Sequence, residues 1–175
     1  MALICIGSVC FSLFQIGILV LFIINYFSSH IKKLFSRYFP SNKIDNEIES
    51  ILQLKKENKK YEEGRYIELQ KNECLKEIFS LTKNLSVVLK FGSTWCKPCI
   101  NIKEYFKNQK NSFDVTLVDI DVDIHKKLKE SHIINALPTF EFYFLLNNEW
   151  IKTYRIEGGN QKEIEKAFKK YCLSK

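Results

Sequence analysis

The chain has 175 residues, with 27 Lys and Arg against 20 Asp and Glu, and its formal net charge is +7. A composition of 46% apolar and 14% aromatic residues excludes a disordered chain. Six Gly and three Pro exclude collagen-like and low-complexity classes, and six Cys are too sparse for a disulfide-stapled miniprotein.

The charge is unevenly placed, because residues 1–31 contain no Asp, Glu, Lys or Arg, but beyond them the basic residues form no cluster. Only three of the basic residues are Arg, and lysines alternate with acidic residues, as in Lys71, Glu73, Lys76 and Glu77. Proteins that bind nucleic acid through its phosphates usually present a clustered basic stripe, often with Arg for bidentate contacts. The sequence therefore predicts a solvated surface of mixed charge and no nucleic-acid partner.

Residues 2–27 form an almost entirely apolar stretch, in which Gln15 and Asn25 are the only strongly polar side chains. As a helix this stretch would extend roughly 39 Å, which is more than a hydrocarbon core of about 30 Å. A helix of a soluble core would carry polar residues along one face, and this stretch does not. The sequence therefore predicts an N-terminal hydrophobic helix that associates with a membrane.

Two fates are open for this segment, which we assign to residues 1–31. It has no basic n-region and is longer than the apolar stretch of a typical signal peptide, which favours an uncleaved single-pass anchor. Basic residues begin at Lys32 and none precedes it, so the positive-inside rule would place the remainder of an anchored chain in the cytosol. Cleavage near residues 28–31 would instead deliver the domain into the secretory or endomembrane lumen.

Residues 32–64 have the composition of a charged helical linker. Ile44, Ile48, Ile51 and Leu52 recur at helical spacing before a charged run. The simplest interpretation is a juxtamembrane helical spacer. The modest apolar stripe leaves open a helix that binds a partner or a membrane surface.

Residues 65–175 alternate between strand and helix patterns, which predicts one α/β domain with a mixed sheet covered by helices. Asn147-Asn148 separates the last two strands and indicates an antiparallel hairpin, and Gly158-Gly159 precedes the last helix. The expected strands are 65–69, 86–91, 115–120, 140–146 and 150–156, and the expected helices are 71–82, 99–110, 124–132 and 161–171.

The run Trp95-Cys96-Lys97-Pro98-Cys99 lies where an apolar strand ends and a helix begins. Two cysteines in the first turn of a helix can form a disulfide with each other. The first sulfur lies beside the helix N-terminus, whose free N–H groups and dipole stabilise a thiolate, so Cys96 is the expected nucleophile. Cys99 is expected to resolve the mixed disulfide, and Lys97 adds a positive charge between them.

A Cys-x-x-Cys pair has two other uses. It can be half of a zinc site, but zinc needs four ligands, and His125, His132, Cys74 and Cys172 form no second ligand pair. We therefore expect no metal. The pair can also be a purely structural disulfide, although that role would not call for a strand-to-helix turn preceded by Trp.

The same residues are part of a resemblance to the thioredoxin family that covers about residues 65–175. Residues 87–99 resemble the family's second strand and active-site loop, and residues 118–123 are similar to its third strand. Residues 136–140, Ala-Leu-Pro-Thr-Phe, resemble the loop whose proline is cis and packs against the disulfide, and residues 157–160 match the turn before the last helix. The resemblance implies a thioredoxin-like fold, with a central mixed sheet flanked by four helices, and thiol–disulfide exchange.

The resemblance also implies the surroundings of the cysteine pair. Exchange requires neither metal nor organic cofactor, and the expected partners are protein disulfide clients together with an unidentified recycling reductase or oxidant. The residues expected to shape the substrate groove are Trp95, Lys97, Pro98, Leu137 and Pro138.

One departure from the family pattern concerns the position six residues before Cys96. The family usually has a buried acid there that helps to deprotonate the resolving cysteine, and this chain has Lys90. A buried ammonium is costly unless it is paired, and Asp119 on the neighbouring strand is the candidate partner. Alternatively, the aliphatic stem could let the amine reach water. Lys90 and Asp119 are therefore expected to tune the acidity of the cysteines.

Taken together, these residues predict a membrane-associated thiol–disulfide oxidoreductase that exchanges disulfides with protein clients. The alternative is a thioredoxin-fold binding or structural subunit of a membrane-associated complex, with incidental redox activity. The intact pair of cysteines argues against this alternative, and Lys90 argues mildly for it.

Overall fold

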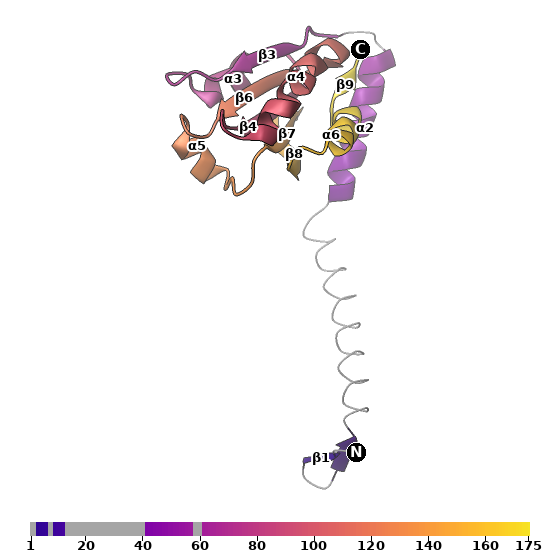
Figure 1. Cartoon of the computed structure of the whole chain (residues 1–175). Coiled ribbons are helices and arrows are strands. Elements are labelled where there is room, and N and C mark those ends of the chain that lie inside the picture. The colour runs from indigo at the N-terminus through magenta and orange to yellow at the C-terminus, as the bar shows by residue number, and fades with distance from the viewer. Residues whose placement is uncertain (1–2, 7–8, 13–40, 58–60) are drawn as a thin grey trace. The chain divides into compact units, whose positions relative to one another are not determined.

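The computed structural model describes residues 3–6, 9–12, 41–57 and 61–175. It divides into two compact units, Met1–Lys43 and Ile44–Lys175, which are described separately (Figure 1).

In the first unit, residues 3–6 and 9–12 form two paired strands. Strands β1 (Leu3–Ile6) and β2 (Val9–Ser12) pair antiparallel, with Ile4 opposite Phe11. The prediction of a hydrophobic helix is therefore wrong at these residues. The rest of the apolar stretch, residues 13–27, lies outside the described part of the chain. The segment is rich in β-branched and aromatic residues, which favour strands, and an apolar run without periodicity fits either structure. Among the helices that the structure describes, none combines the length and hydropathy of a membrane span.

The second unit is built on a five-stranded mixed sheet. Its strands lie in the order β3-β6-β4-β7-β8. Strands β3, β6 and β4 run parallel to one another, and β7 and β8 form a hairpin whose first strand is antiparallel to β4. This arrangement confirms the predicted mixed sheet. Asn147 and Asn148, the two residues of the hairpin loop, both have positive φ (50° and 65°), which a tight two-residue hairpin requires. The strands are β3 (Arg65–Glu68), β4 (Ser86–Gly92), β6 (Thr116–Asp121), β7 (Thr139–Leu146) and β8 (Glu149–Glu157).

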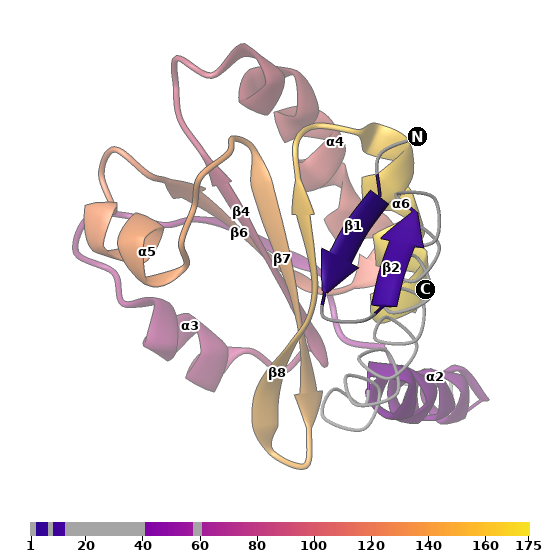
Figure 2. The same ribbon diagram turned by 90° about the horizontal axis from the view of Figure 1, so that it is seen from below.

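Helices cover both faces of this sheet and enclose two apolar cores. Figure 2 shows α3 (Leu75–Leu81) and α5 (Lys126–Ser131) on one side, and α4 (Lys97–Ser112) and α6 (Gln161–Tyr171) on the other. Alternate side chains of β4 point into the two cores. Val88 belongs to the cluster with α4 and α6, and Val87 belongs to the cluster with α3. The four flanking helices of the thioredoxin-like fold are thus confirmed.

The observed elements differ from the sequence prediction at several points. Helix α3 begins at Leu75 rather than at residue 71 and is therefore shorter than predicted. Helix α4 begins at Lys97, two residues before the predicted start at Cys99. The two-residue strands β5 (Phe113–Asp114) and β9 (Leu173–Ser174) pair antiparallel and were not predicted. Strands of two residues are too short to show periodicity in a sequence.

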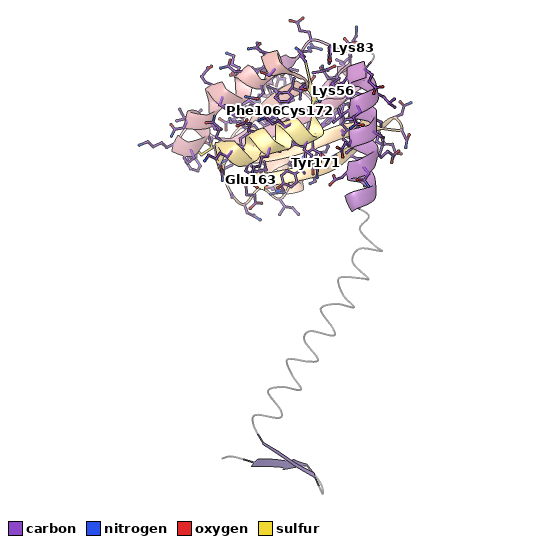
Figure 3. All side chains as sticks on the ribbon, turned by 90° about the vertical axis from the view of Figure 1, so that its right-hand side faces the viewer. Lys56, Lys83, Phe106, Glu163, Tyr171 and Cys172 are labelled. Atoms are coloured by element: carbon purple, nitrogen blue, oxygen red, sulfur yellow. A yellow bond between two sulfur atoms is a disulfide. The ribbon has the colours of Figure 1, made fainter. Side chains whose placement is uncertain are left out.

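Helix α2 (Ser41–Glu57) lies within residues 32–64 and packs against the domain. Its side chains Ile48 and Leu52 are buried in the same core as α6. Lys170 of α6 also makes an ion pair with Asp45 of α2, at 2.6 Å. Figures 1 and 3 accordingly show α2 beside α6. The apolar stripe of α2, for which the sequence left open a partner or a membrane surface, therefore packs against the protein's own domain.

Truncating Ile48, whose side chain is only 1% exposed, tests this packing. We expect Ile48→Ala to lower the free energy of unfolding by about 2–4 kcal/mol, because removal of buried methyl groups leaves a cavity. Leu54→Ala on the same helix is the matched control, since Leu54 is 59% exposed. Urea denaturation measures both, and equal effects of the two substitutions would contradict the docking of α2.

Candidate functional site

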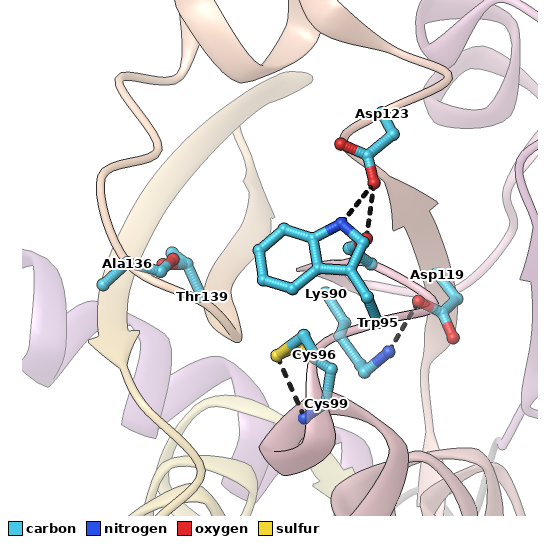
Figure 4. Close-up of a disulfide and its surroundings, with 9 residues drawn as sticks. Lys90, Trp95, Cys96, Cys99, Asp119, Asp123, Ala136 and Thr139 are labelled. Carbon is cyan, nitrogen blue, oxygen red and sulfur yellow. Dashed lines mark hydrogen bonds and ion pairs between the residues drawn. A yellow bond between two sulfur atoms is a disulfide. The ribbon is translucent and has the colours of Figure 1, made fainter.

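The cysteine pair occupies the junction between β4 and α4. Cys96 is the N-cap of α4, and its Sγ accepts a hydrogen bond from the backbone N–H of Cys99 at 3.3 Å. Pro98 lies in the first turn, where its missing N–H and fixed φ are tolerated. Cys96 and Cys99 form a disulfide with their Cα atoms 5.2 Å apart, so the described state is the oxidised one (Figure 4).

Trp95 is held over this junction by an acid that the sequence analysis did not identify. The indole Nε1 donates to Asp123 Oδ2 at 2.8 Å, and Ser93 Oγ donates to the same oxygen at 2.5 Å (Figure 4). The hydrogen bond from Ser93, followed by that from Trp95, lowers the pKa of Asp123. Trp95 nevertheless remains 71% exposed, so its ring faces solvent beside the disulfide. The sequence signal that could have identified Asp123 is its position just after strand β6, which is the neighbour of β4 in the sheet.

A groove begins at Cys96. Four of the five predicted groove residues line it: Trp95, Lys97, Pro98 and Leu137. The fifth, Pro138, is buried and does not line the groove. The Leu137–Pro138 peptide bond is cis. A Cβ atom placed on Gly159 would contact both Pro138 Cγ (3.8 Å) and the Pro98 carbonyl oxygen (3.7 Å), so these two prolines approach the same point. The complete lining is Trp95, Cys96, Lys97, Pro98, Lys129, Ile134, Asn135 and Leu137.

Lys129, Ile134 and Asn135 are groove residues that sequence reasoning missed. They follow no motif and come from α5 and the connection to β7. Only the folding of that connection against the α4 N-terminus places them beside Cys96.

Lys90 and Asp119 meet beneath the cysteines, as predicted. The two residues are opposite each other in the β4–β6 register, and Lys90 Nζ lies 2.7 Å from Asp119 Oδ1. Lys90 is 3% exposed, so the alternative of an amine reaching water is wrong. Tyr66 donates to the second oxygen of Asp119 at 3.0 Å. Burial, reinforced by the Asp119 carboxylate, raises the pKa of Tyr66.

This ion pair also lies close to the second cysteine. A Cβ atom placed on Gly92 would be 3.3 Å from Lys90 Nζ and 3.5 Å from Cys99 Sγ, so both atoms border the same small space. Cys99, Lys90 and Asp119 together line a cavity between α4 and the sheet, which does not include Cys96. The two cysteines therefore border different cavities.

The remaining cysteines and histidines of residues 61–175 line neither the groove at Cys96 nor the cavity at Cys99. Cys74 is an exposed free thiol and Cys172 a buried one, and burial raises the pKa of Cys172. His125 hydrogen-bonds the Leu69 carbonyl and His132 contacts Glu141. In the described part of the chain, no three His, Cys, Asp or Glu side chains are grouped so as to hold a metal ion.

Comparison with known proteins gives one consistent family. The family profile described as thioredoxin matches residues 65–170. Thioredoxin 3 of Plasmodium falciparum is 62% identical over 178 residues, which cover 100% of this chain and 99% of that protein. Thioredoxin of Ophiophagus hannah is 37% identical over 86 residues, which cover 49% of this chain and 78% of that protein.

Solved structures agree with these sequence relatives. A crystal structure of a P. falciparum thioredoxin has 60% identity and a TM-score of 0.62, over 66% of this chain and 95% of that one. Reduced Schistosoma mansoni thioredoxin has 31% identity and a TM-score of 0.54, over 61% and 98% of the two chains. Because the profile extends from β3 into α6 and one relative matches over its full length, the chain belongs to the thioredoxin family and is a protein-disulfide oxidoreductase with a Cys96–Cys99 redox pair.

Proposed function

We propose that the protein exchanges disulfides with protein clients through a division of labour between its two cysteines. In the dithiol form, the Cys96 thiolate attacks a client disulfide, forms a mixed disulfide and releases one client thiolate. Cys99, as its thiolate, then attacks the Cys96 sulfur and releases the second client thiolate, which takes up a proton. The client gains two electrons and two protons, and the protein is left with the Cys96–Cys99 disulfide.

The observation that carries this assignment is the different setting of the two sulfurs. Cys96 is the N-cap of α4 and borders the groove that contains Trp95 and Leu137. An N-terminal position favours a thiolate, and a groove gives a client access to it. Cys99 lies inside the turn and borders the cavity on the other side. It is thus within reach of Cys96 and away from the groove.

The groove provides the proposed client contacts. Trp95 supplies a rigid, exposed aromatic surface, and Lys97 and Pro98 flank the reactive sulfur. Leu137 lies before the cis Pro138, where an extended client segment can pair with its backbone. The exchange itself uses no metal or organic cofactor. A reductase is needed to return the disulfide to the dithiol, or an oxidant if the protein works in the opposite direction.

Single-cysteine variants test the two roles. We expect Cys99→Ser to accumulate mixed disulfides with clients through Cys96, because the attacking thiol remains and the resolving thiol is lost. Cys96→Ser should accumulate almost none. Non-reducing gels of the two variants measure the difference, and equal trapping by both would defeat the assignment.

The alternative is a thioredoxin-fold binding subunit in which redox activity is incidental. Reduction of insulin by dithiothreitol separates the two functions. We expect the wild type to accelerate insulin reduction at least tenfold over dithiothreitol alone, because a positioned thiolate exchanges far faster than a free thiol. A rate equal to that of the Cys96→Ser/Cys99→Ser variant would favour the binding subunit.

We further propose that the Lys90–Asp119 pair tunes the redox potential. A cation bordering Cys99 stabilises the thiolate form of the pair and therefore favours the dithiol over the disulfide. The same charge supplies no base to the resolving cysteine. Asp119 neutralises much of the field of Lys90 at 2.7 Å, so the effect is moderate.

Exchanging the two charges provides the test. Lys90→Asp alone would place two buried carboxylates together, whereas Lys90→Asp/Asp119→Lys keeps the ion pair and reverses it. We expect the double variant to have a potential lower by roughly 30 mV and to release mixed disulfides faster. Asp119→Asn is the control with an unpaired cation, and its potential should rise. Glutathione titration and single-turnover kinetics measure these effects; an unchanged potential and rate in the double variant would remove the tuning role.

Membrane association through residues 2–27 is likewise proposed, supported by the apolar run in the sequence. We expect the full-length chain to stay in the membrane pellet after alkaline carbonate extraction. Replacement of Leu19 and Leu21 by Asp should release it, because charges in an apolar span are costly. Mass spectrometry of the pelleted protein measures cleavage. A soluble product that begins near residues 28–31 would instead identify a signal peptide.

A further inference from the structure

The groove beside Cys96 has one wall that belongs to neither a helix nor a strand. Ile134, Asn135 and Leu137 line it, and all three lie in the connection between α5 and β7, residues 132–138. At its start, Ile133 has φ of 51° and its side chain is 67% exposed. A β-branched residue is strained in this left-handed region and adopts it only where the surroundings impose it. The position of the wall therefore depends on whatever holds Ile133.

Backbone hydrogen bonds at the end of α5 contribute to that hold, from Ile133 N–H to the Glu130 carbonyl (3.0 Å) and from Ile134 N–H to the Lys129 carbonyl (2.9 Å). Arg155 of β8 adds a hold from outside this segment. Its guanidinium donates two hydrogen bonds to successive backbone carbonyls of the connection, NH1 to His132 O and NH2 to Ile133 O, both at 2.8 Å. The planar fork of an Arg side chain suits this simultaneous contact with two acceptors. The bonds hold the two peptide units on either side of the Ile133 Cα atom, where φ is positive.

Arg155 is itself anchored to the sheet. It is opposite Glu141 of β7 in the strand register, and its NH1 lies 3.3 Å from Glu141 Oε1. Its NH2 contacts Glu157 Oε1 at 2.9 Å. Arg155 Nε is buried without a hydrogen-bond partner in the described part of the chain, a cost that a side chain free to turn outward would avoid.

Glu141 is a firm anchor because it stays charged although it is fully buried. Burial by itself raises its pKa, but hydrogen bonds from His132 (2.6 Å), Tyr143 (2.8 Å) and Lys152 (3.1 Å) outweigh burial and lower the pKa to about 2. The carboxylate is therefore ionised at neutral pH and continues to hold the guanidinium of Arg155.

We propose that Arg155, anchored by Glu141, is a positioning residue for client recognition: it holds the strained His132–Ile133 backbone and thereby sets the groove wall of Ile134 and Leu137. The proposal rests on the proposed function, because it assumes that clients occupy this groove. It assigns Arg155 to client affinity and not to the thiol chemistry, since no atom of Arg155 lines the groove or contacts either cysteine.

The test compares Arg155→Gln with Lys152→Gln. Both variants remove a cation from Glu141, but Lys152 makes no hydrogen bond to the 132–138 backbone. Insulin serves as the protein client and hydroxyethyl disulfide as a small substrate that does not fill the groove. For Arg155→Gln we expect KM for insulin to rise roughly tenfold, with kcat and the hydroxyethyl disulfide rate within about twofold of the wild type. Lys152→Gln should leave all three unchanged.

A second pair of variants separates positioning from loss of stability. Glycine adopts positive φ without strain, so Ile133→Gly should recover part of the insulin KM when it is added to Arg155→Gln. Arg155→Lys, which can reach only one carbonyl at a time, should give an intermediate KM. If Arg155→Gln folds poorly, Arg155→Lys alone decides: an insulin KM equal to that of the wild type overturns the proposal.

Three further outcomes overturn it: equal KM values for Arg155→Gln and Lys152→Gln, a parallel loss of the hydroxyethyl disulfide rate, or no recovery on adding Ile133→Gly. Failure of the proposed function is distinguishable, because it would appear in the wild type as an absence of insulin reduction. Normal insulin reduction by the wild type with an unaltered KM in Arg155→Gln would remove only the positioning role.

Discussion

Strand β4 is buried along its whole length, and the arrangement of the site depends on this burial. It pairs with β6 on one side and β7 on the other, and helices cover both of its faces. A strand enclosed in this way ends at a fixed point, and its last residue, Gly92, leads directly into the turn before α4. The free N–H groups of the α4 N-terminus are consequently held beside Cys96 by the end of a fully buried strand.

Burial of the sheet also dictates how its charges are arranged. Lys90 lies opposite Asp119, and Glu141 lies opposite Arg155, each pair in direct register across neighbouring strands. A buried charge without a partner would cost several kcal/mol, and a cross-strand partner offsets much of that cost. The two pairs serve different parts of the site. The first borders Cys99, and the second reaches the connection that flanks Cys96.

The packing of α2 extends the domain beyond the region that the thioredoxin profile matches. The profile begins at residue 65, whereas Ile48 and Leu52 of α2 are part of the same core as Phe168 of α6. An amphipathic helix with a narrow apolar stripe gains stability only where a complementary surface receives it. The outer surface of α6 and its neighbours provides that surface, so a segment with the composition of a linker belongs physically to the folded unit.

The sequence by itself determined the elements whose signals are local. The apolar strand before Cys96, the helix at 161–171 and the Asn147-Asn148 turn follow from periodicity and turn chemistry over a few residues, and the Lys90–Asp119 pair follows from adjacent strands. Only the tertiary structure decided the docking of α2 and the paired strands in the apolar N-terminal run. It also decided which residues form the groove and which acid holds Trp95. Such contacts join residues far apart in the chain, and their energies depend on surfaces that exist only after the sheet and helices have packed.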